Sequence, residues 1–365
     1  EHDISIAKKE ASLTIENLNY QLNSGSPEIK NSRVELRLSN NLLVIDSLVC
    51  SIGNESKIQY NGAIENIFGY FLLKNSTLKI GGNLYSDWIF IDELLNSDTT
   101  TVSTNATAIE FPDNIIANIN AKIIDFTFDR FHMRNFTSKL SYNDKIFKVK
   151  NTELETMSGN ITGDVVFEQL ENGTLRLIST SEMKAINVRQ LFYEFRNFGQ
   201  TTIRHKHLRG SISSEVYLRH EWDKHLNPII ENLYGFIDLK IDNGHLINFE
   251  PMMLMSDYIS VNELKKIKFS TLENQIEIKN KKIEIPFMEI HSSAINIAGS
   301  GSHSFSNDIN YEFKILLDEI ISGKIRGQKN KKEVSVFEEI VQDDGVKGIT
   351  MFLKMEGSID NPKIS

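Results

Sequence analysis

Apolar and polar residues alternate with a period of two along most of this chain. In one stretch Val34, Leu36 and Leu38 are apolar, and the residues beside them are charged or hydroxylated. Because successive side chains of a β-strand point to opposite faces, this spacing predicts strands with one apolar and one polar face. The alternation recurs at 237–242, 276–285, 309–315 and 351–356. Each such strand has an apolar side that must be covered by something.

The composition also favours sheet over helix. The 365 residues include 47 Ile and 32 Leu but only 10 Ala. Branched side chains suit a pleated surface, whereas Ala is the residue that a helix accommodates best. Two helical signals stand out: Asn187 is placed to cap a short helix that carries Phe192, Phe195 and Phe198, and residues 248–266 suggest one or two short helices. We interpret the three phenylalanines as packing at the end of a sheet.

Two turns and two breaks punctuate the alternation. The sequence Asp242-Asn243-Gly244 predicts a hairpin, because Asn-Gly tolerates positive φ, and Asn280-Lys281 predicts a second one. Residues 97–107 are a polar, low-complexity connector, and five of the eleven residues 323–333 are Lys or Arg. We interpret the basic run 324–332 as a solvated loop, with attraction to anionic lipid headgroups as the alternative.

Three segments resemble one another at residues 42–64, 146–167 and 282–305. In each, an alternating strand leads through a polar turn to a second strand. We therefore predict a first β-groove repeat over residues 1–96, a polar linker over 97–110, a second repeat over 111–205 and a C-terminal region over 206–365.

Charge, cysteine content and the length of apolar stretches limit the classes of partner and the cellular location that the chain can have. Forty basic and 49 acidic side chains give a net charge of −9, without a basic stripe able to grip a phosphate backbone, so we expect no nucleic-acid partner. One cysteine, Cys50, forms no internal disulfide and leaves the compartment open. The densest apolar stretch, Ile67–Leu73, is too short to span a bilayer. Because the chain starts at Glu1 without a leader, we expect it to be part of a longer polypeptide whose anchor is missing.

The histidines do not form a recognisable metal motif. His220 and His225 are five residues apart, whereas the zincin pair needs four, and the sequence around them alternates like a strand. We expect both to be surface histidines on a sheet. His205 and His207 would share one strand face, but no third ligand lies near them in sequence. We predict no metal site.

Other catalytic patterns are equally lacking. Gly299-Ser300-Gly301 lies in an alternating region and predicts a bulge or a bend rather than a phosphate-binding loop. Acidic residues are scattered, so no carboxylate pair can be nominated, and Cys50 reads as an inert buried thiol. We predict a protein that is not an enzyme and holds no cofactor.

The strand faces need a cover that the sequence does not obviously supply. Helices are scarce, and a sandwich of this length should show clearer linkers between its domains. We therefore predict a mainly β fold: an elongated, curved antiparallel sheet built from repeats, forming an apolar groove, with a few short helices. Roughly twenty strands spaced about 4.8 Å apart would extend on the order of 95 Å.

The C-terminal half carries a family resemblance. FRNFGQTTIRHKHLRG from Phe195, GFIDLKIDNGHLINFEPMMLMSDYI from Gly235, FSTLENQIEIKNKKIEIPFMEIHSSAINIAGSGSHSF from Phe269 and the ending MEGSIDNP follow one another in order. Together they resemble the C-terminal region of AsmA-like envelope proteins of Gram-negative bacteria, in their Bacteroidota form. Residues 1–194 resemble the less distinctive repeat region of that family.

The resemblance implies a location and a role. It suggests a periplasmic protein anchored in the inner membrane, related to TamB-type and bridge-like lipid-transfer proteins, whose β-groove conducts phospholipid to the outer membrane and supports its biogenesis. The family contributes no catalytic residues. It implies structural roles instead: hairpin glycines at Gly235 and Gly244, a strand-to-helix corner at Phe249 and Pro251, and a strand irregularity at Pro286. The basic run 324–332 has no counterpart in the family pattern.

The candidate lipid-contacting residues lie in this C-terminal region, and the sequence does not separate groove lining from core. The strand candidates are Ile237, Leu239, Ile241, Ile276, Ile278, Ile283 and Ile285. A methionine cluster adds Met252, Met253 and Met255, either as core filler or as an adaptable lipid-contacting surface. Two alternatives stay open: an envelope assembly factor that binds proteins by sheet-edge pairing, and an envelope hydrolase with clustered titratable residues.

Overall fold

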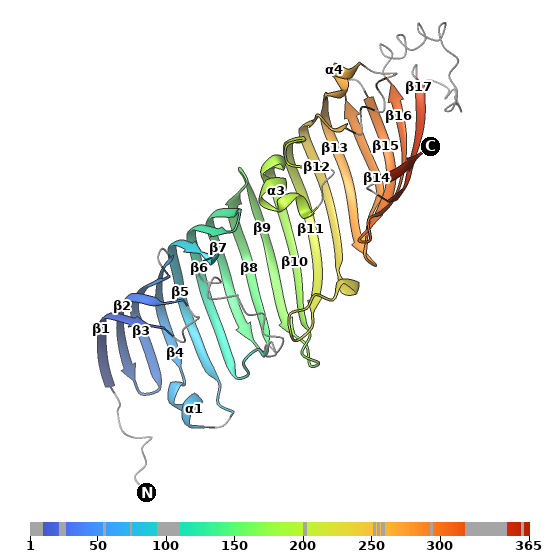
Figure 1. The fold of residues 1–365 in the computed structure, drawn as a ribbon. Helices are drawn as coiled ribbons and strands as arrows, with labels where there is room; N and C mark the ends of the chain where they lie inside the picture. The colour runs from blue at the N-terminus through green and yellow to red at the C-terminus, as the bar shows by residue number, and fades with distance from the viewer. Residues whose placement is uncertain are drawn as a thin grey trace, which may run out of the picture. The chain divides into compact units, whose positions relative to one another are not determined.

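The computed structural model describes two compact units. It covers residues 10–21, 27–53, 56–73, 75–92, 110–199, 203–250, 253, 256, 260–292, 295–317, 349–358 and 361–365. The first unit comprises residues 1–156, 160–181 and 220–229, and the second comprises 157–159, 182–219 and 230–365. The described residues are mainly β, with a few short helices, which confirms the predicted fold class (Figure 1).

The first unit is built from long strands that pair with their neighbours in the chain. They are β1 (Glu10–Tyr20), β2 (Ile29–Ser39), β3 (Leu42–Ile52), β4 (Ser56–Glu65), β5 (Leu78–Phe90), β6 (Ile115–Phe128), β7 (Phe131–Asn143) and β8 (Ile146–Thr156). The strands β9 (Gly159–Gln169), β10 (Leu175–Asn187) and β11 (Leu208–Trp222) contribute residues to both units. Each of the three similar sequence segments holds two strands that follow one another in the chain: β3 and β4, β8 and β9, and β14 (Lys282–Ser292) and β15 (Ile295–Ser304).

One pair departs from the predicted antiparallel arrangement. β5 and β6 are parallel, with Leu78 opposite Ile115 and Phe90 opposite Thr127. Parallel neighbours need a connection of about a dozen residues or more, and residues 91–114 supply that length. The predicted linker over 97–110 falls in this connection, and all of it except Glu110 lies outside the described residues. The sheet is therefore mixed.

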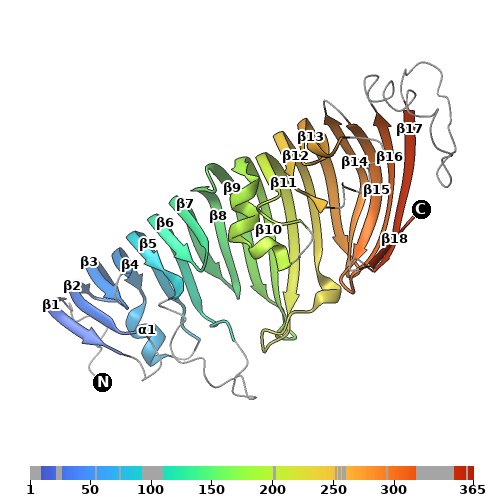
Figure 2. The same ribbon diagram turned by 45° about the horizontal axis from the view of Figure 1, so that its top comes forward.

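The second unit continues the same construction. Its further strands are β12 (Tyr234–Ile247), β13 (Lys266–Lys279), β14 (Lys282–Ser292), β15 (Ile295–Ser304), β16 (Asp308–Leu317), β17 (Ile349–Ser358) and β18 (Asn361–Ile364). Each pairs antiparallel with the next, from β11–β12 to β17–β18. Figure 2 shows these strands side by side. The last one, β18, is short and contains Pro362, a residue that discourages further pairing at a sheet edge.

The two predicted hairpins have different outcomes. Asn280 and Lys281, with φ of 52° and 59°, form the tight turn between β13 and β14, as predicted. The predicted turn at Asp242-Asn243-Gly244 is wrong, because β12 runs straight through it to Ile247. Asn243 does take a positive φ of 52°, but as an irregularity inside the strand. Gly235 and Gly244 are thus strand residues and not hairpin glycines.

The helices are short and lie at strand ends. They are α1 (Ile67–Leu72), α3 (Val188–Glu194) and α4 (Val261–Leu264), with 3-10 turns η2 (Arg196–Gly199) and η3 (Ile230–Asn232). The predicted cap is confirmed: Asn187 Oδ1 accepts a hydrogen bond from the Gln190 N–H at 3.1 Å. The expected phenylalanine contacts also form, with Phe198 packed edge-on against Phe192 and stacked on Phe195. Among its described residues, the segment 248–266 contains the helical turn α4, and Glu250 and Met253 have 3-10 conformation.

Candidate functional site

The predicted strand candidates converge on one face of the second unit. In the β12–β13 register Ile237 lies opposite Ile276 and Gly235 opposite Ile278, and in β13–β14 Ile278 lies opposite Ile283. Residues in register share a face, so we call this the apolar face of the second unit. It comprises Ile212, Val216, Ile237, Leu239, Ile241, Leu272, Ile276, Ile278, Ile283, Ile285, Met288 and Ile290.

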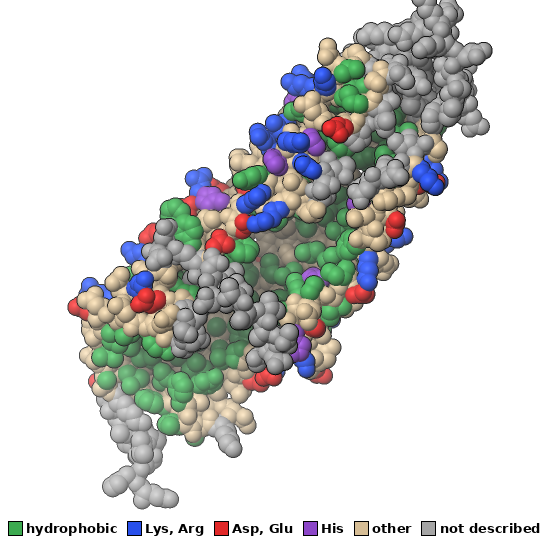
Figure 3. All heavy atoms as spheres, in the orientation of Figure 1, with side chains coloured by type: hydrophobic (Ala, Val, Ile, Leu, Met, Phe, Trp, Pro, Cys, Tyr) green, Lys and Arg blue, Asp and Glu red, His purple; other side chains and the backbone are tan. Residues whose placement is uncertain are grey.

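The exposure of this face is its most informative property. All seven predicted strand candidates are half-buried, although they lie in a multi-stranded sheet flanked on both sides by neighbours. A second protein layer would bury such side chains almost completely, as happens to residues in close-packed interiors. Figure 3 shows hydrophobic side chains lining a hollow over β12 and β13. The apolar face is therefore accessible in this chain.

The face keeps its composition across a strand irregularity. Apolar residues sit at odd positions in Ile283 and Ile285 but at even positions in Met288 and Ile290. The switch occurs at Pro286 and Phe287, where the pairing register shifts on both sides of β14. Proline lacks the N–H that a ladder needs, so a bulge accommodates it. The strand irregularity expected at Pro286 is thus present.

Aromatic rings extend the same face over two glycines. Gly299 lies opposite Phe313 and Gly301 opposite Tyr311, and the two rings stack with centroids 5.8 Å apart. A Cβ at Gly299 would come within 2.6 Å of Phe313 Cδ1, so the ring occupies that space. Burial raises the pKa of the Tyr311 hydroxyl. The bulge or bend predicted at Gly299–Gly301 is wrong, because the extra residue of the β14–β15 pair lies on β14, between Ile285 and Met288. The two glycines instead make room for the rings.

The first unit carries an apolar face of the same kind. Val34, Leu36 and Leu38 of β2 are half-buried and lie in register with apolar residues of β3, including the buried Ile45. Figure 3 shows hydrophobic side chains gathered over the N-terminal strands. Cys50 is buried among them, and burial raises the pKa of its thiol, in line with the predicted inert role.

Tyr60 lies flat on this first face. Its Oη donates to the Gly81 carbonyl at 3.1 Å and lies close above Gly62 and Gly82. The opposite face carries an amide ladder, in which Asn120 Nδ2 donates to Asn83 Oδ1 at 3.0 Å. The packing of Tyr60 over glycines was not predicted from the sequence. Its signal in the sequence was the set of glycines at 62, 81 and 82.

Most buried hydroxyls on these faces are bound to backbone of a neighbouring strand. Ser86 Oγ donates to the Lys57 carbonyl at 2.6 Å, and Ser138 Oγ donates to the Lys150 carbonyl at 3.0 Å. In the second unit Ser214 Oγ donates to the Asp238 carbonyl at 2.8 Å. Such groups hold the sheet together and present no free polar atom.

Asn274 is different. It is 9 % exposed, lies on the apolar face between Leu239 and Met288, and its Oδ1 has no hydrogen-bond partner. Asn274 was not predicted as a site residue, because its apolar neighbours Leu239 and Met288 lie on other strands and are known only from the register.

The polar faces carry ordinary surface ion pairs. Lys240 and Glu273 are 3.3 Å apart, and Lys279 contacts Glu277 at 2.6 Å and Glu284 at 3.1 Å. These side chains are partly or largely exposed, so the pairs are screened by water and contribute little stability.

One ion pair is more enclosed. In the first unit Arg176 Nε donates to the buried Glu221 at 2.7 Å, and Arg176 Nη1 lies 3.2 Å from Glu168. The hydrogen bond from Arg176 to Glu221 raises the pKa of the guanidinium.

The histidines occupy positions that differ from the prediction. His205 and His207 lie in a turn before β11 and not in a strand, so the expectation that they share a strand face is wrong. His220 was expected at the surface but is half-buried against Trp222, with ring centroids 4.2 Å apart. Burial lowers the pKa of His220. His225 is exposed and its backbone N–H donates to Asp223 Oδ1. Within the described residues, His, Cys, Asp and Glu form no group suited to hold a metal ion.

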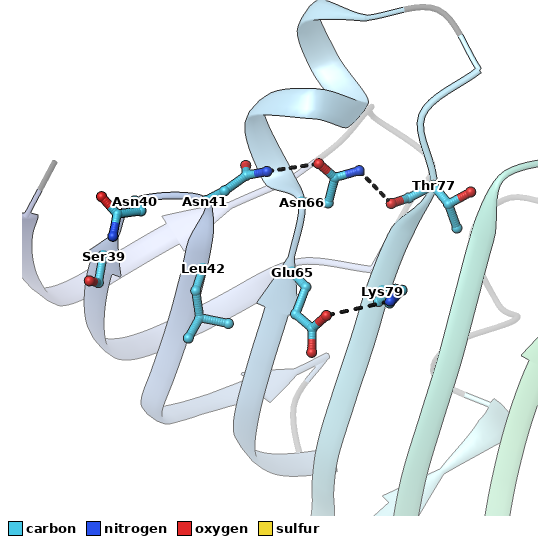
Figure 4. Close-up of a pocket in the computed structure, with 8 residues that line it drawn as sticks. All are labelled: Ser39, Asn40, Asn41, Leu42, Glu65, Asn66, Thr77 and Lys79. Carbon is cyan, nitrogen blue, oxygen red and sulfur yellow. Dashed lines mark hydrogen bonds and ion pairs between the residues drawn. The ribbon is translucent and has the colours of Figure 1, made fainter. Parts of the chain in front are cut away.

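A polar pocket of about 640 Å³ lies at the ends of β2 to β5. In Figure 4 its amides point toward one another: Asn41 Nδ2 donates to Asn66 Oδ1 at 2.7 Å, and Asn66 Nδ2 donates to the Thr77 carbonyl at 2.9 Å. Asn41 Oδ1 also accepts from the Phe68 N–H at 2.8 Å. The network positions the start of α1.

The remaining predicted residues are partly outside the structure's description. Met253 is half-buried, whereas Met252, Met255, Pro251 and the basic run 324–332 lie outside the described residues. Phe249 lies two residues beyond the end of β12, where a strand-to-helix corner was expected, and its ring centroid lies 5.9 Å from that of His207.

Comparisons with known proteins found no similar protein. No protein-family model, no curated protein and no solved structure matches the chain. Among the described residues, the helices are too short to cross a membrane.

Proposed function

We propose that this chain shields hydrocarbon chains of phospholipids from water on its apolar sheet faces, without catalysing a reaction. The observation that carries the proposal is the half-buried state of Ile237, Ile276 and their neighbours in register. A soluble sheet rarely leaves a contiguous apolar surface open unless a partner covers it.

Physical chemistry makes acyl chains a suitable partner. Transfer of one methylene from water to an apolar surface is worth about 0.8 kcal/mol, so a chain of about sixteen carbons gains roughly 12 kcal/mol. The lining consists mainly of Ile, Leu, Met and aromatic side chains, without charged groups in the rows described above. Hydrocarbon binds such a surface without directional contacts, which permits movement along it.

The resemblance to AsmA-like proteins supports the same role. It favours a periplasmic location, an inner-membrane anchor in the full-length protein and conduction of phospholipid toward the outer membrane. Burial of tails needs no cofactor, metal or catalytic group.

Mass spectrometry of the purified chain tests the proposal. We expect phospholipid to co-purify with the protein in detergent-free buffer, at about one molecule or more per chain. A protein that is folded, soluble and free of lipid would overturn the proposal.

A second candidate function rests on β1. Leu13, Leu18 and Tyr20 are 53 %, 44 % and 51 % exposed, and β2 is the neighbour on one side of this strand. A long strand with exposed apolar side chains is suited to pair with another protein, as in an assembly factor. Edge pairing predicts that proline substitutions in β1 abolish partner binding and leave lipid content unchanged.

A further inference from the structure

Asn274 interrupts an otherwise apolar surface. In register it lies between Leu239 of β12 and Met288 of β14, and Leu272 and Ile276 flank it along β13 on the same face. The next residues on the neighbouring strands are Ile237, Ile241 and Ile290. The immediate surroundings of the amide on this face are therefore entirely hydrocarbon and thioether.

A polar group in such a place normally has a partner. Leaving a buried hydrogen-bonding atom unpaired costs free energy, which is why nearly all are satisfied in folded proteins. Ser214, in the same cross-strand row, donates to the Asp238 carbonyl. Asn274 Oδ1 has no partner and is buried, although a Leu of nearly the same shape would fit this surface without a penalty.

The chemistry of the missing partner follows from the surroundings. An amide oxygen accepts a hydrogen bond, so the partner is a donor. The charged side chains nearby, Glu273 and Glu277, belong to the alternating positions of β13 and form ion pairs with lysines there. Among the described residues around Asn274 on this face there is no Lys, Arg, Asp or Glu to compensate an ionised guest, so the donor is neutral.

We propose that Asn274 is a hydrogen-bonding subsite that selects guests carrying a hydroxyl next to their hydrocarbon chains. This inference rests on the proposed function, because the guest reaches Asn274 only if its tails occupy the apolar face. Asn274 Oδ1 is enclosed in the free chain, so the flanking side chains turn aside when the guest binds. The amide then fixes the depth at which such a guest sits, while the flanking residues contact its tails.

Two lipids that differ in one donor test the subsite. 1,2-Dioleoylglycerol has a free hydroxyl, and its 3-acetyl ester lacks that donor. We expect the wild-type chain to bind the first roughly five- to ten-fold more tightly, the effect of one net hydrogen bond. Asn274→Leu should bind both equally, and Ile276→Leu, two residues along the same face, should keep the wild-type preference.

The outcomes separate the two proposals. If wild type binds neither compound nor dioleoylphosphatidylcholine, the proposed function fails. If wild type binds lipid but does not prefer the free hydroxyl, or if Asn274→Leu keeps the preference, the subsite is wrong and the proposed function stands.

A lipid-free measurement gives an independent check. Asn274→Leu should raise the Tm of the delipidated protein, because it removes an unpaired buried oxygen. A lowered Tm would mean that the amide already has a partner in the free protein, and would overturn the subsite.

Discussion

Replacing Ile237 by Asp distinguishes an open apolar face from a sealed core. Ile237 is half-buried between Val216 of β11 and Ile276 of β13. Ile212 lies on the same face but is only 6 % exposed. The pair of variants Ile237→Asp and Ile212→Asp therefore places the same carboxylate at an accessible and at an enclosed position.

The expected magnitudes follow from exposure. Full burial of an Ile side chain is worth about 1.5–3 kcal/mol, so a half-buried one loses roughly 1–1.5 kcal/mol. The poorer fit of Asp in a strand adds up to about 1 kcal/mol. The total of about 2 kcal/mol should lower the Tm of a unit of this size by about 4–8 °C. The carboxylate of Ile212→Asp is enclosed without a partner, which costs about 3–5 kcal/mol and should prevent stable folding.

The assay combines thermal unfolding with lipid analysis. Circular dichroism gives the Tm of each variant, and mass spectrometry gives its co-purified phospholipid. We expect Ile237→Asp to fold with a moderately lower Tm and to lose most of its lipid. Two results refute the reasoning: Ile237→Asp failing to fold as Ile212→Asp does, or Ile237→Asp folding and carrying as much lipid as wild type.

Three further predictions concern stability. Gly82→Ala should lower the Tm, because its Cβ would clash with the Asn61 backbone carbonyl oxygen and lie 2.7 Å from Tyr60 Oη. Gly81→Ala, whose Cβ would have its nearest neighbour at 3.8 Å, should leave the Tm unchanged or slightly raised, and equal effects of the two variants would contradict this. Because burial lowers the pKa of His220, the unfolded state binds more protons below about pH 6.5, and stability should fall as pH drops through that value. His220→Gln should therefore show a shallower loss of Tm between about pH 7 and pH 5 than wild type, and an identical slope would argue against a buried imidazole. Arg176→Met leaves the buried Glu221 without its 2.7 Å partner and should cost about 3 kcal/mol in unfolding free energy, and a neutral effect would show that this carboxylate is solvated.

Local alternation predicted the strands because side-chain direction in a strand depends on position alone. Val34, Leu36 and Leu38 share a face in β2, and Ile309, Tyr311, Phe313 and Ile315 share one in β16. The turn at Asn280-Lys281 also followed from local chemistry, since both residues adopt the positive φ that a two-residue hairpin requires.

Other features depended on information that is not local. Asn243 has the positive φ that its sequence favours, yet the strand continues because Leu246 and Ile247 still pair with β13. The parallel β5–β6 pair follows from a long connection whose path sequence alone leaves open. Asn274 became a candidate only through register, since its apolar neighbours Leu239 and Met288 come from other strands.

Photo-crosslinking tests most directly whether lipid covers the apolar face. A photoreactive amino acid replaces Ile276, on the apolar face, or its neighbour Gln275, whose amide lies beside Asp238 on the polar face. The full chain is then irradiated with vesicles of ³²P-labelled phospholipid. We expect labelled adducts from position 276 and none from position 275. Equal labelling at both positions, or none at 276 in a folded protein, would contradict a lipid-covered face.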